Sequence, residues 1–207
     1  MKINKEGLII VGAGGHAKVV LSTALDVFEK VAGFLDDDPH LTDTRLGEYP
    51  VLGLGNLLDG KRFETAVFGL GNNATRKRIA EQYHDIQWKT LIHPTAYVHP
   101  SVKLGVGTVV FAGAVIQPDV TIGKHCIINT GATVDHDCRI GDYSHLAPGV
   151  HLAGNVQIGE GVFLGIGSVT IPNIIIGEWA IIAAGGVVIS QVSAHKTVIG
   201  IPAKERV

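Results

Sequence analysis

An aliphatic residue recurs at every sixth position through the second half of the chain. Counting in sixes from Ile92 to Val188 meets seventeen residues, and all but Thr170 are aliphatic. The residue four places further on is usually small or β-branched, as at Ala96 and Val102. An α-helix repeats every 3.6 residues and a half-buried strand every two, so neither produces this spacing. Two inward positions in six residues instead predict a short strand followed by a tight corner.

A second period of eighteen residues is superimposed on the first. Glycines follow aliphatic residues at this interval, at Gly105, Gly123, Gly141, Gly159 and Gly177. Three six-residue units therefore make one coil, with a glycine at one recurrent corner. Stacked coils of three short strands form a parallel β-helix of triangular cross-section, in which neighbouring coils complete the core. We expect this fold, with a C-terminal tail, over residues 91–207.

The first ninety residues have a different organisation. Residues 7–11 read as an apolar strand, followed by a glycine loop and a helix from about Ala17 to Phe28. Further strands are expected at residues 31–35 and 65–70. The order β-α-β with glycines at the first turn is that of a nucleotide-binding unit with a parallel sheet. We expect residues 1–90 to form a small α/β domain of this kind.

The glycine loop does not by itself identify a ligand. Gly12, Gly14 and Ala17 satisfy the G-x-G-x-x-G/A pattern of dinucleotide sites. Ninety residues are too few for the six-stranded double unit that holds a whole dinucleotide, so a half-sized site for a nucleotide-linked small molecule fits better. The alternative is a turn that only lets helix pack closely on strand. Arg76 begins a later helix and either reaches a phosphate or is a solvated surface side chain.

Composition excludes several classes of function. The formal charge is −2 and 17% of residues are charged, so there is no basic excess for binding nucleic acid. The chain has no run of eighteen apolar residues and starts with a polar segment, which predicts a soluble cytoplasmic protein with no membrane insertion. Cys126 and Cys138 lack the spacing of a zinc site, so we expect free buried thiols and no metal.

One histidine lies where an acid or base would be useful. His136 and Asp137 are the second and third residues after the inward Val134, so they fall at a corner with their side chains directed outward. A neighbouring carboxylate makes an imidazole more basic, as a general base requires. The corner conformation decides whether the two side chains bond. His145 follows nine residues later, half a coil away, so it meets His136 only between subunits.

The whole pattern resembles a known family. The hexads, with the closing segment Val198–Lys204, resemble those of the hexapeptide-repeat acyltransferases, whose domain is a left-handed β-helix that usually works as a homotrimer. Joined to a truncated nucleotide-type unit, they resemble the PglD/NeuD-like sugar acetyltransferases over essentially the whole chain. The resemblance implies acetyl-CoA as co-substrate, a nucleotide-linked amino sugar as acceptor, and a homotrimer with active sites between subunits.

The resemblance also implies roles for individual residues. In the run from Asn129 to Cys138 it makes His136 the base, Asp137 the residue that raises its basicity in place of the glutamate frequent in relatives, and Asn129 a polar active-site residue. Coenzyme A would be contacted by His145, near the thioester, and by the backbone at Ile166 and Ala184. The nucleotide sugar would be held by Gly14, Gly15, His16, Asp36, Asp37 and Gly71.

The expected activity is acetylation of the 4-amino group of a UDP-linked 4-amino-4,6-dideoxy sugar, for a bacterial surface glycan or glycoprotein. The amine attacks acetyl-CoA directly with His136 as base, since both cysteines occupy inward positions. Alternatives are a GDP- or dTDP-linked 4-amino sugar, sialic-acid-type O-acetylation, and a β-helix that binds a nucleotide sugar without turnover. A zinc-dependent carbonic anhydrase of β-helical fold needs a close histidine pair, and no two histidines here are five apart.

Overall fold

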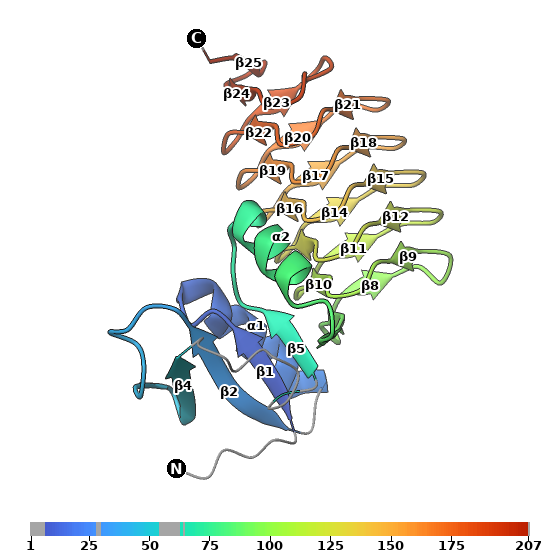
Figure 1. Cartoon of the computed structure of the whole chain (residues 1–207). Helices are drawn as coiled ribbons and strands as arrows, with labels where there is room; N and C mark the ends of the chain where they lie inside the picture. Colours follow the sequence, from blue (N-terminus) through green and yellow to red (C-terminus); the bar gives the residue numbers. More distant parts are fainter. Residues whose placement is uncertain (1–6, 28–29, 54–62, 64, 207) are drawn as a thin grey trace. The chain divides into compact units, whose positions relative to one another are not determined.

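The computed structural model describes residues 7–27, 30–53, 63 and 65–206 (Figure 1). The chain divides into two compact units, Met1–Leu91 and Ile92–Val207. Within the described residues, neither helix has the length and apolar character needed to cross a bilayer.

The first unit is built on one sheet with the strand order β3-β4-β2-β1-β5-β6. Neighbouring strands are parallel except for the antiparallel pair β3 and β4. The strands are β1 (Leu8–Val11), β2 (Val31–Asp36), β3 (Arg45–Leu46), β4 (Tyr49–Gly53), β5 (Thr65–Phe68) and β6 (Gln87–Trp88). The helices are α1 (Gly15–Val27) and α2 (Asn73–Gln82).

The predicted α/β unit is confirmed, with differences at its edges. The three predicted strands correspond to β1, β2 and β5, and the predicted helix to α1, whose expected last residue Phe28 lies outside the described residues. β5 ends at Phe68, two residues earlier than expected, and a Cβ on the next residue, Gly69, would lie 2.8 Å from Ala17 and from Ile10. The β3–β4 hairpin and β6 were not predicted: β3 and β6 have two residues each, too few for a periodic signal, and β4 contains Pro50, which argues against a strand.

The second unit is the predicted parallel β-helix, with a two-residue strand in every hexad (Figure 1). The first face contains β7 (Leu91–Ile92), β10 (Val109–Val110), β13 (Ile127–Ile128), β16 (His145–Leu146), β19 (Phe163–Leu164), β22 (Ile181–Ile182), β24 (Thr197–Ile199) and β25 (Lys204–Glu205). The second contains β8 (Tyr97–Val98), β11 (Val115–Ile116), β14 (Thr133–Val134), β17 (His151–Leu152), β20 (Val169–Thr170) and β23 (Val187–Val188). The third contains β9 (Lys103–Leu104), β12 (Thr121–Ile122), β15 (Arg139–Ile140), β18 (Gln157–Ile158) and β21 (Ile175–Ile176).

The core of the β-helix consists of the predicted inward positions. Val134, Ile140 and Leu146 are buried, as are Cys138, Ser144 and Val150, the residues four places after them. In the first coil, which has a neighbouring coil on one side only, Ala96 and Val102 are partly buried and the inward expectation is wrong for Ile92, which is 38% exposed. Thr170, the polar exception, is also buried and accepts a hydrogen bond from the backbone N–H of Ala153. Cys138 faces the core, and burial raises the pKa of its thiol to about 11. Both cysteines are free and buried, as predicted.

The corners are made by residues in the left-handed region, one in every hexad. From Gly107 to Gly185 such a residue occurs every six positions, with φ between 54° and 73°. Between the first and second faces it is always glycine, and between the second and third it is aspartate or asparagine, as at Asp137. These residue types adopt positive φ at the least steric cost.

The glycines spaced by eighteen residues are not required for the backbone conformation of a corner. Gly105, Gly123 and Gly141 do not have positive φ. A Cβ on Gly141 would lie 2.6 Å from the backbone of Gly159 and Glu160 in the next coil. These positions therefore exclude side chains because successive coils approach each other there.

The two glycine classes predict different costs of substitution. Gly131 has φ of 66° and open space around its missing Cβ, so Gly131→Ala should lower the free energy of unfolding by about 1 kcal/mol through backbone strain alone. Gly141→Ala should lower it by about 3 kcal/mol or more, or prevent folding, because two coils must separate. Urea unfolding of both variants measures the difference, and equal costs would contradict the assignment.

Candidate functional site

A histidine and a carboxylate are joined at the corner after β14. The Nδ1 of His136 lies 2.8 Å from the Oδ2 of Asp137, and the backbone N–H of His136 donates to the carboxylate of Asp135 at 2.8 Å. Asp137 has φ of 61°, which turns the chain so that adjacent side chains can meet. The hydrogen bond that His136 donates to Asp137, followed by the negative charge of Asp135, raises the pKa of His136. The neutral ring then donates Nδ1–H to Asp137 and carries a basic lone pair on Nε2.

A second histidine lies on the first face. His145 is the first residue of β16; it is buried, with 8% of its surface exposed, and makes an edge-to-face contact with Phe163 at 5.2 Å between ring centroids. The Oδ1 of Asn129 accepts the backbone N–H of Thr130, so the amide NH2 is turned to the Nε2 of His145 at 3.2 Å. Since that nitrogen must accept, the proton of a neutral ring is on Nδ1. Asn129 therefore orients His145, whereas His136 lies at a different corner.

Ile166 and Ala184 lie on the corner between the first and second faces. They occupy equivalent places in successive coils, and the carbonyl of Ile166 accepts the N–H of Gly185. Pro148 and Thr130 hold the same place one and two coils before Ile166, and their carbonyls accept the N–H groups of Gly167 and Gly149. Ile166 is 61% exposed. An exposed line of backbone, which we call the CoA edge (Thr130, Pro148, Ile166, Ala184), therefore runs along the β-helix from Asn129 and spans about 14 Å.

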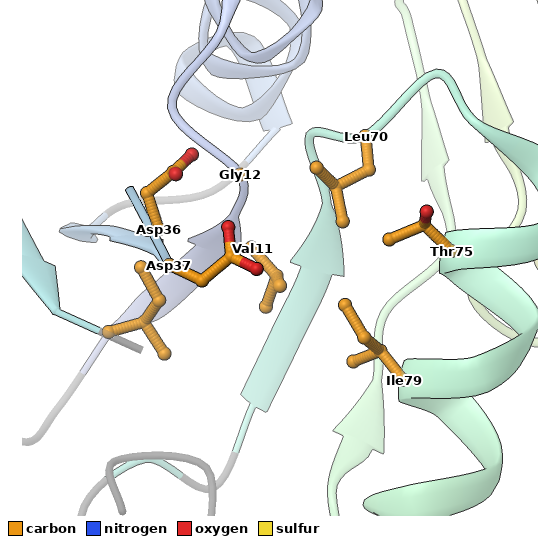
Figure 2. Close-up of a pocket in the computed structure, with 8 residues that line it drawn as sticks. Val11, Gly12, Asp36, Asp37, Leu70, Thr75 and Ile79 are labelled. Carbon is orange, nitrogen blue, oxygen red and sulfur yellow. The ribbon is translucent and has the colours of Figure 1, made fainter. Parts of the chain in front are cut away.

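The first unit contains a pocket at the carboxyl ends of β1, β2 and β5 (Figure 2). This is where open parallel sheets bind ligands. Its lining is largely apolar, with polar groups from the two aspartates and Thr75; the residues are Val11, Gly12, Leu35, Asp36, Asp37, Leu70, Thr75 and Ile79. The predicted Gly14, Gly15 and Gly71 border open space near this edge, since a Cβ on any of them would meet nothing within 4 Å.

The two adjacent aspartates differ in what they bind. One oxygen of Asp36 accepts the N–H of Ala13 at 2.7 Å, and the other accepts the N–H of Asp38 at 3.0 Å. Asp36 therefore fastens the glycine loop to the end of β2. The carboxylate of Asp37 is directed toward the pocket in Figure 2. Of the pair, Asp37 is placed to contact a ligand and Asp36 to shape the site.

His16 and Arg76 occupy the interior behind the loops. Burial and then the charge of Arg76 lower the pKa of His16 to about 4, so its imidazole is neutral at physiological pH. Arg76 is 1% exposed and donates to the carbonyls of Leu70 and Gly71. A solvated surface side chain, one of the two expectations for Arg76, is wrong, because the guanidinium is used to hold the loop that follows β5.

The sequence did not predict the hydrogen bonds that hold the loops around the pocket. The bond from Asp36 to Ala13 spans 23 positions, and no local pattern marks it. The Asn72 side chain caps α2 by accepting the backbone N–H of Thr75, which an asparagine just before the helix could have indicated. Across residues 7–27, 30–53, 63 and 65–206, no three His, Cys, Asp or Glu side chains gather as they would around a metal ion.

Both units match known families. A family model described as the PglD N-terminal domain matches residues 7–83, and one described as bacterial transferase hexapeptide (six repeats) matches residues 119–154. A variant of perosamine N-acetyltransferase from Caulobacter crescentus, solved with CoA and GDP-perosamine, is 39% identical, with a TM-score of 0.94 and 100% of both chains covered. The acetyltransferase domain of PglB from Neisseria gonorrhoeae FA1090, solved with acetyl coenzyme A, is 37% identical with a TM-score of 0.89, covering 98% of this chain and 100% of that one.

Curated sequences match over shorter stretches. UDP-N-acetylbacillosamine N-acetyltransferase from Bacillus subtilis is 41% identical over 117 residues, which are 52% of each chain. Uncharacterized protein L142 of Acanthamoeba polyphaga mimivirus is 32% identical over 105 residues, 49% of this chain and 20% of that protein. The alignments thus span about half and about a fifth of these curated relatives.

The contrast between the two aspartates is testable through stability. Asp36→Ala removes two hydrogen bonds from a carboxylate and should lower the free energy of unfolding by about 2 kcal/mol. Asp37→Ala is the matched control and should stay within about 0.5 kcal/mol of the wild type, as surface substitutions usually do. Urea unfolding measures both, and a larger loss in the control would reverse the assignment.

Proposed function

The chain belongs to the family of PglD-like, hexapeptide-repeat sugar acetyltransferases with a left-handed β-helix, and we propose that it transfers the acetyl group of acetyl-CoA to the amino group of a nucleotide-linked amino sugar. The observation that carries the proposal is the His136–Asp137 pair on an exposed corner of the β-helix. The pair supplies a base of raised pKa, which this reaction needs. The acceptor we propose is the 4-amino group of a 4-amino-4,6-dideoxy sugar.

The reaction proceeds by direct attack. Nε2 of His136 takes a proton from the amine as its nitrogen forms a bond to the thioester carbon, and CoA leaves as the thiolate when the tetrahedral intermediate collapses. Asp137 stabilises the imidazolium formed in this step. A thiol nucleophile is not supported, because Cys138 faces the core and its pKa is raised to about 11.

Acetyl-CoA is proposed to lie along the CoA edge, with its thioester near His145. Asn129 orients the His145 ring and places the proton of the neutral ring on Nδ1, and we propose that this imidazole lies beside the thioester. His136 lies at another corner of the same chain, so one complete site takes His136 from one copy and the CoA edge from the next. This division supports a homotrimer with active sites between subunits.

The nucleotide sugar is proposed to bind the pocket of the first unit. Gly14 and Gly15, at the start of α1, present backbone N–H groups to its phosphates. His16, which lies behind the glycine loop, is neutral and acts as a hydrogen-bonding group, while Asp37, which lines the pocket, contacts the nucleoside. Relatives support two nucleotides: the C. crescentus structure contains GDP-perosamine, and the B. subtilis protein is named for a UDP sugar. The expected preference for UDP thus has no more support than GDP, and both are included in the test. We propose a cytoplasmic reaction, where acetyl-CoA is supplied.

Thiol release from acetyl-CoA, followed with a thiol reagent, tests the activity. Purified wild type is assayed with UDP-, GDP- and dTDP-linked 4-amino sugars and with sialic acid. We expect rapid release with one amino sugar and a fall of about 100-fold or more in His136→Ala. Release with sialic acid alone would reassign the reaction to O-acetylation, and release with none would contradict the proposal.

The pH profile tests the role of Asp137. Because only the unprotonated His136 accepts a proton, kcat/KM should rise with pH through the raised pKa of this residue, with a midpoint above 6.5. Asp137→Asn removes the charge, so the midpoint of the rise in kcat/KM should move to lower pH. The maximum of kcat/KM at high pH should fall about 100-fold, because the amide can also favour the wrong tautomer of His136.

Asp135→Asn is the matched control. It removes a charge that also raises the pKa of His136, but it keeps an oxygen that can accept the backbone N–H. The midpoint of the rise in kcat/KM should again move to lower pH, while the maximum of kcat/KM at high pH stays within about twofold of the wild-type value. An unshifted midpoint in Asp137→Asn would show that this carboxylate does not set the basicity of the base.

A further inference from the structure

The imidazole of His136 lies against Gly154, the equivalent corner residue one coil further on. A Cβ added to Gly154 would lie 2.7 Å from both Cε1 and Nε2 of the ring and 3.3 Å from Nδ1. Real Cβ atoms do not approach other atoms to 2.7 Å, so any side chain at this position would displace the ring. The ring occupies the space that a side chain at 154 would fill.

The backbone does not require glycine at this position. Gly154 does not have positive φ, unlike Gly131 and Gly149 at the glycine corner. Hydrogen bonds between successive coils place Pro118, His136 and Gly154 in one column, because their carbonyls accept the N–H groups of Asp137, Asn155 and Asn173 in turn. Pro172 follows in the same column, eighteen residues after Gly154. Since proline and histidine both fit this corner, the missing side chain of Gly154 is explained by the ring above it.

Without such support the ring would be poorly fixed. The side chain of His136 is 60% exposed, and its bond to Asp137 holds only Nδ1. An imidazole that is held only at Nδ1 can still change its tilt about the hydrogen bond to Asp137. Contact with the flat glycine backbone supplies the second constraint, on the edge that carries Nε2 and Cε1.

We propose that Gly154 is a positioning residue for His136: its missing side chain seats the imidazole so that Nδ1 reaches Asp137 while Nε2 is held in a fixed place. The inference rests on the proposed function for its catalytic meaning, although the seating of the ring is independent of any reaction. A methyl group at 154 would move the ring by about 1 Å, a displacement that costs about 100-fold in rate at a reacting centre.

Gly154→Ala is the direct test. We expect kcat to fall about 100-fold, with KM for both substrates changed by less than about twofold, because the binding residues are elsewhere. The displaced imidazole of His136 should lose its hydrogen bond to Asp137, so in an NMR titration its pKa should lie below that of the wild type. Pro172→Ala, in the same column but two coils from His136, is the control and should leave both measurements unchanged.

A second pair of variants separates ring seating from a general effect on the fold. In a His136→Ala background there is no ring to displace, so adding Gly154→Ala should leave the residual rate unchanged. It should also raise the melting temperature, since alanine restricts the unfolded chain. A further loss of rate in that background would overturn the inference, because Gly154 would then act through something other than His136.

The outcomes also distinguish this inference from the proposed function. If the wild type transfers no acetyl group, the proposed function fails, while the NMR titration of His136 in Gly154→Ala still decides whether the glycine seats the ring. If Gly154→Ala keeps the wild-type rate and titration, the seating role is overturned and the proposed function stands.

Discussion

The stacking of one coil on the next is the constraint on which the β-helix depends. From β7 to β23 each strand is two residues long and pairs only with strands of the coils before and after it, as Thr133 pairs with Val115 and His151. A single coil cannot bury its inward side chains, so the core exists only when successive coils remain in register. Backbone approach at Gly141 and its equivalents leaves no room for a side chain between coils. The hexad register therefore decides the direction of every side chain in the unit.

That register also decides where chemistry can be placed. Side chains at equivalent places form columns along the β-helix. The neighbours of a functional residue in the coils before and after it are therefore the residues eighteen positions away in the sequence. His136 lies between Pro118 and Gly154 for this reason, and the CoA edge is a similar column of backbone. His145 lies on the first face, whereas His136 lies at the corner between the second and third faces. The two side chains of one chain are therefore far apart. The proposed assembly of several copies follows from this geometry as much as from the resemblance to trimeric enzymes.

The sequence predicted the architecture well because each element of it repeats. Seventeen hexads report the same geometry, and the outward place of His136 follows from its distance to Val134. The bond between His136 and Asp137 was not predictable, since it depends on φ of 61° at Asp137. In the first unit the roles of Asp36 and Arg76 depend on hydrogen bonds to loop backbone, which single-residue patterns do not encode. A repeated pattern can be recognised in the sequence, so the β-helix was predictable. A site depends on contacts that occur once, and these leave no such pattern.

Three histidines illustrate how neighbours determine the chemistry of one residue type. Burial and the charge of Arg76 keep His16 neutral, with a pKa of about 4, so it can only exchange hydrogen bonds. Exposure and a bonded carboxylate do the reverse at His136, whose raised pKa suits proton transfer. At His145 the amide of Asn129 selects which nitrogen carries the proton. In the acetyl transfer that we propose, His16 helps to orient the acceptor, His136 removes its proton and His145 lies beside the thioester, with no covalent intermediate.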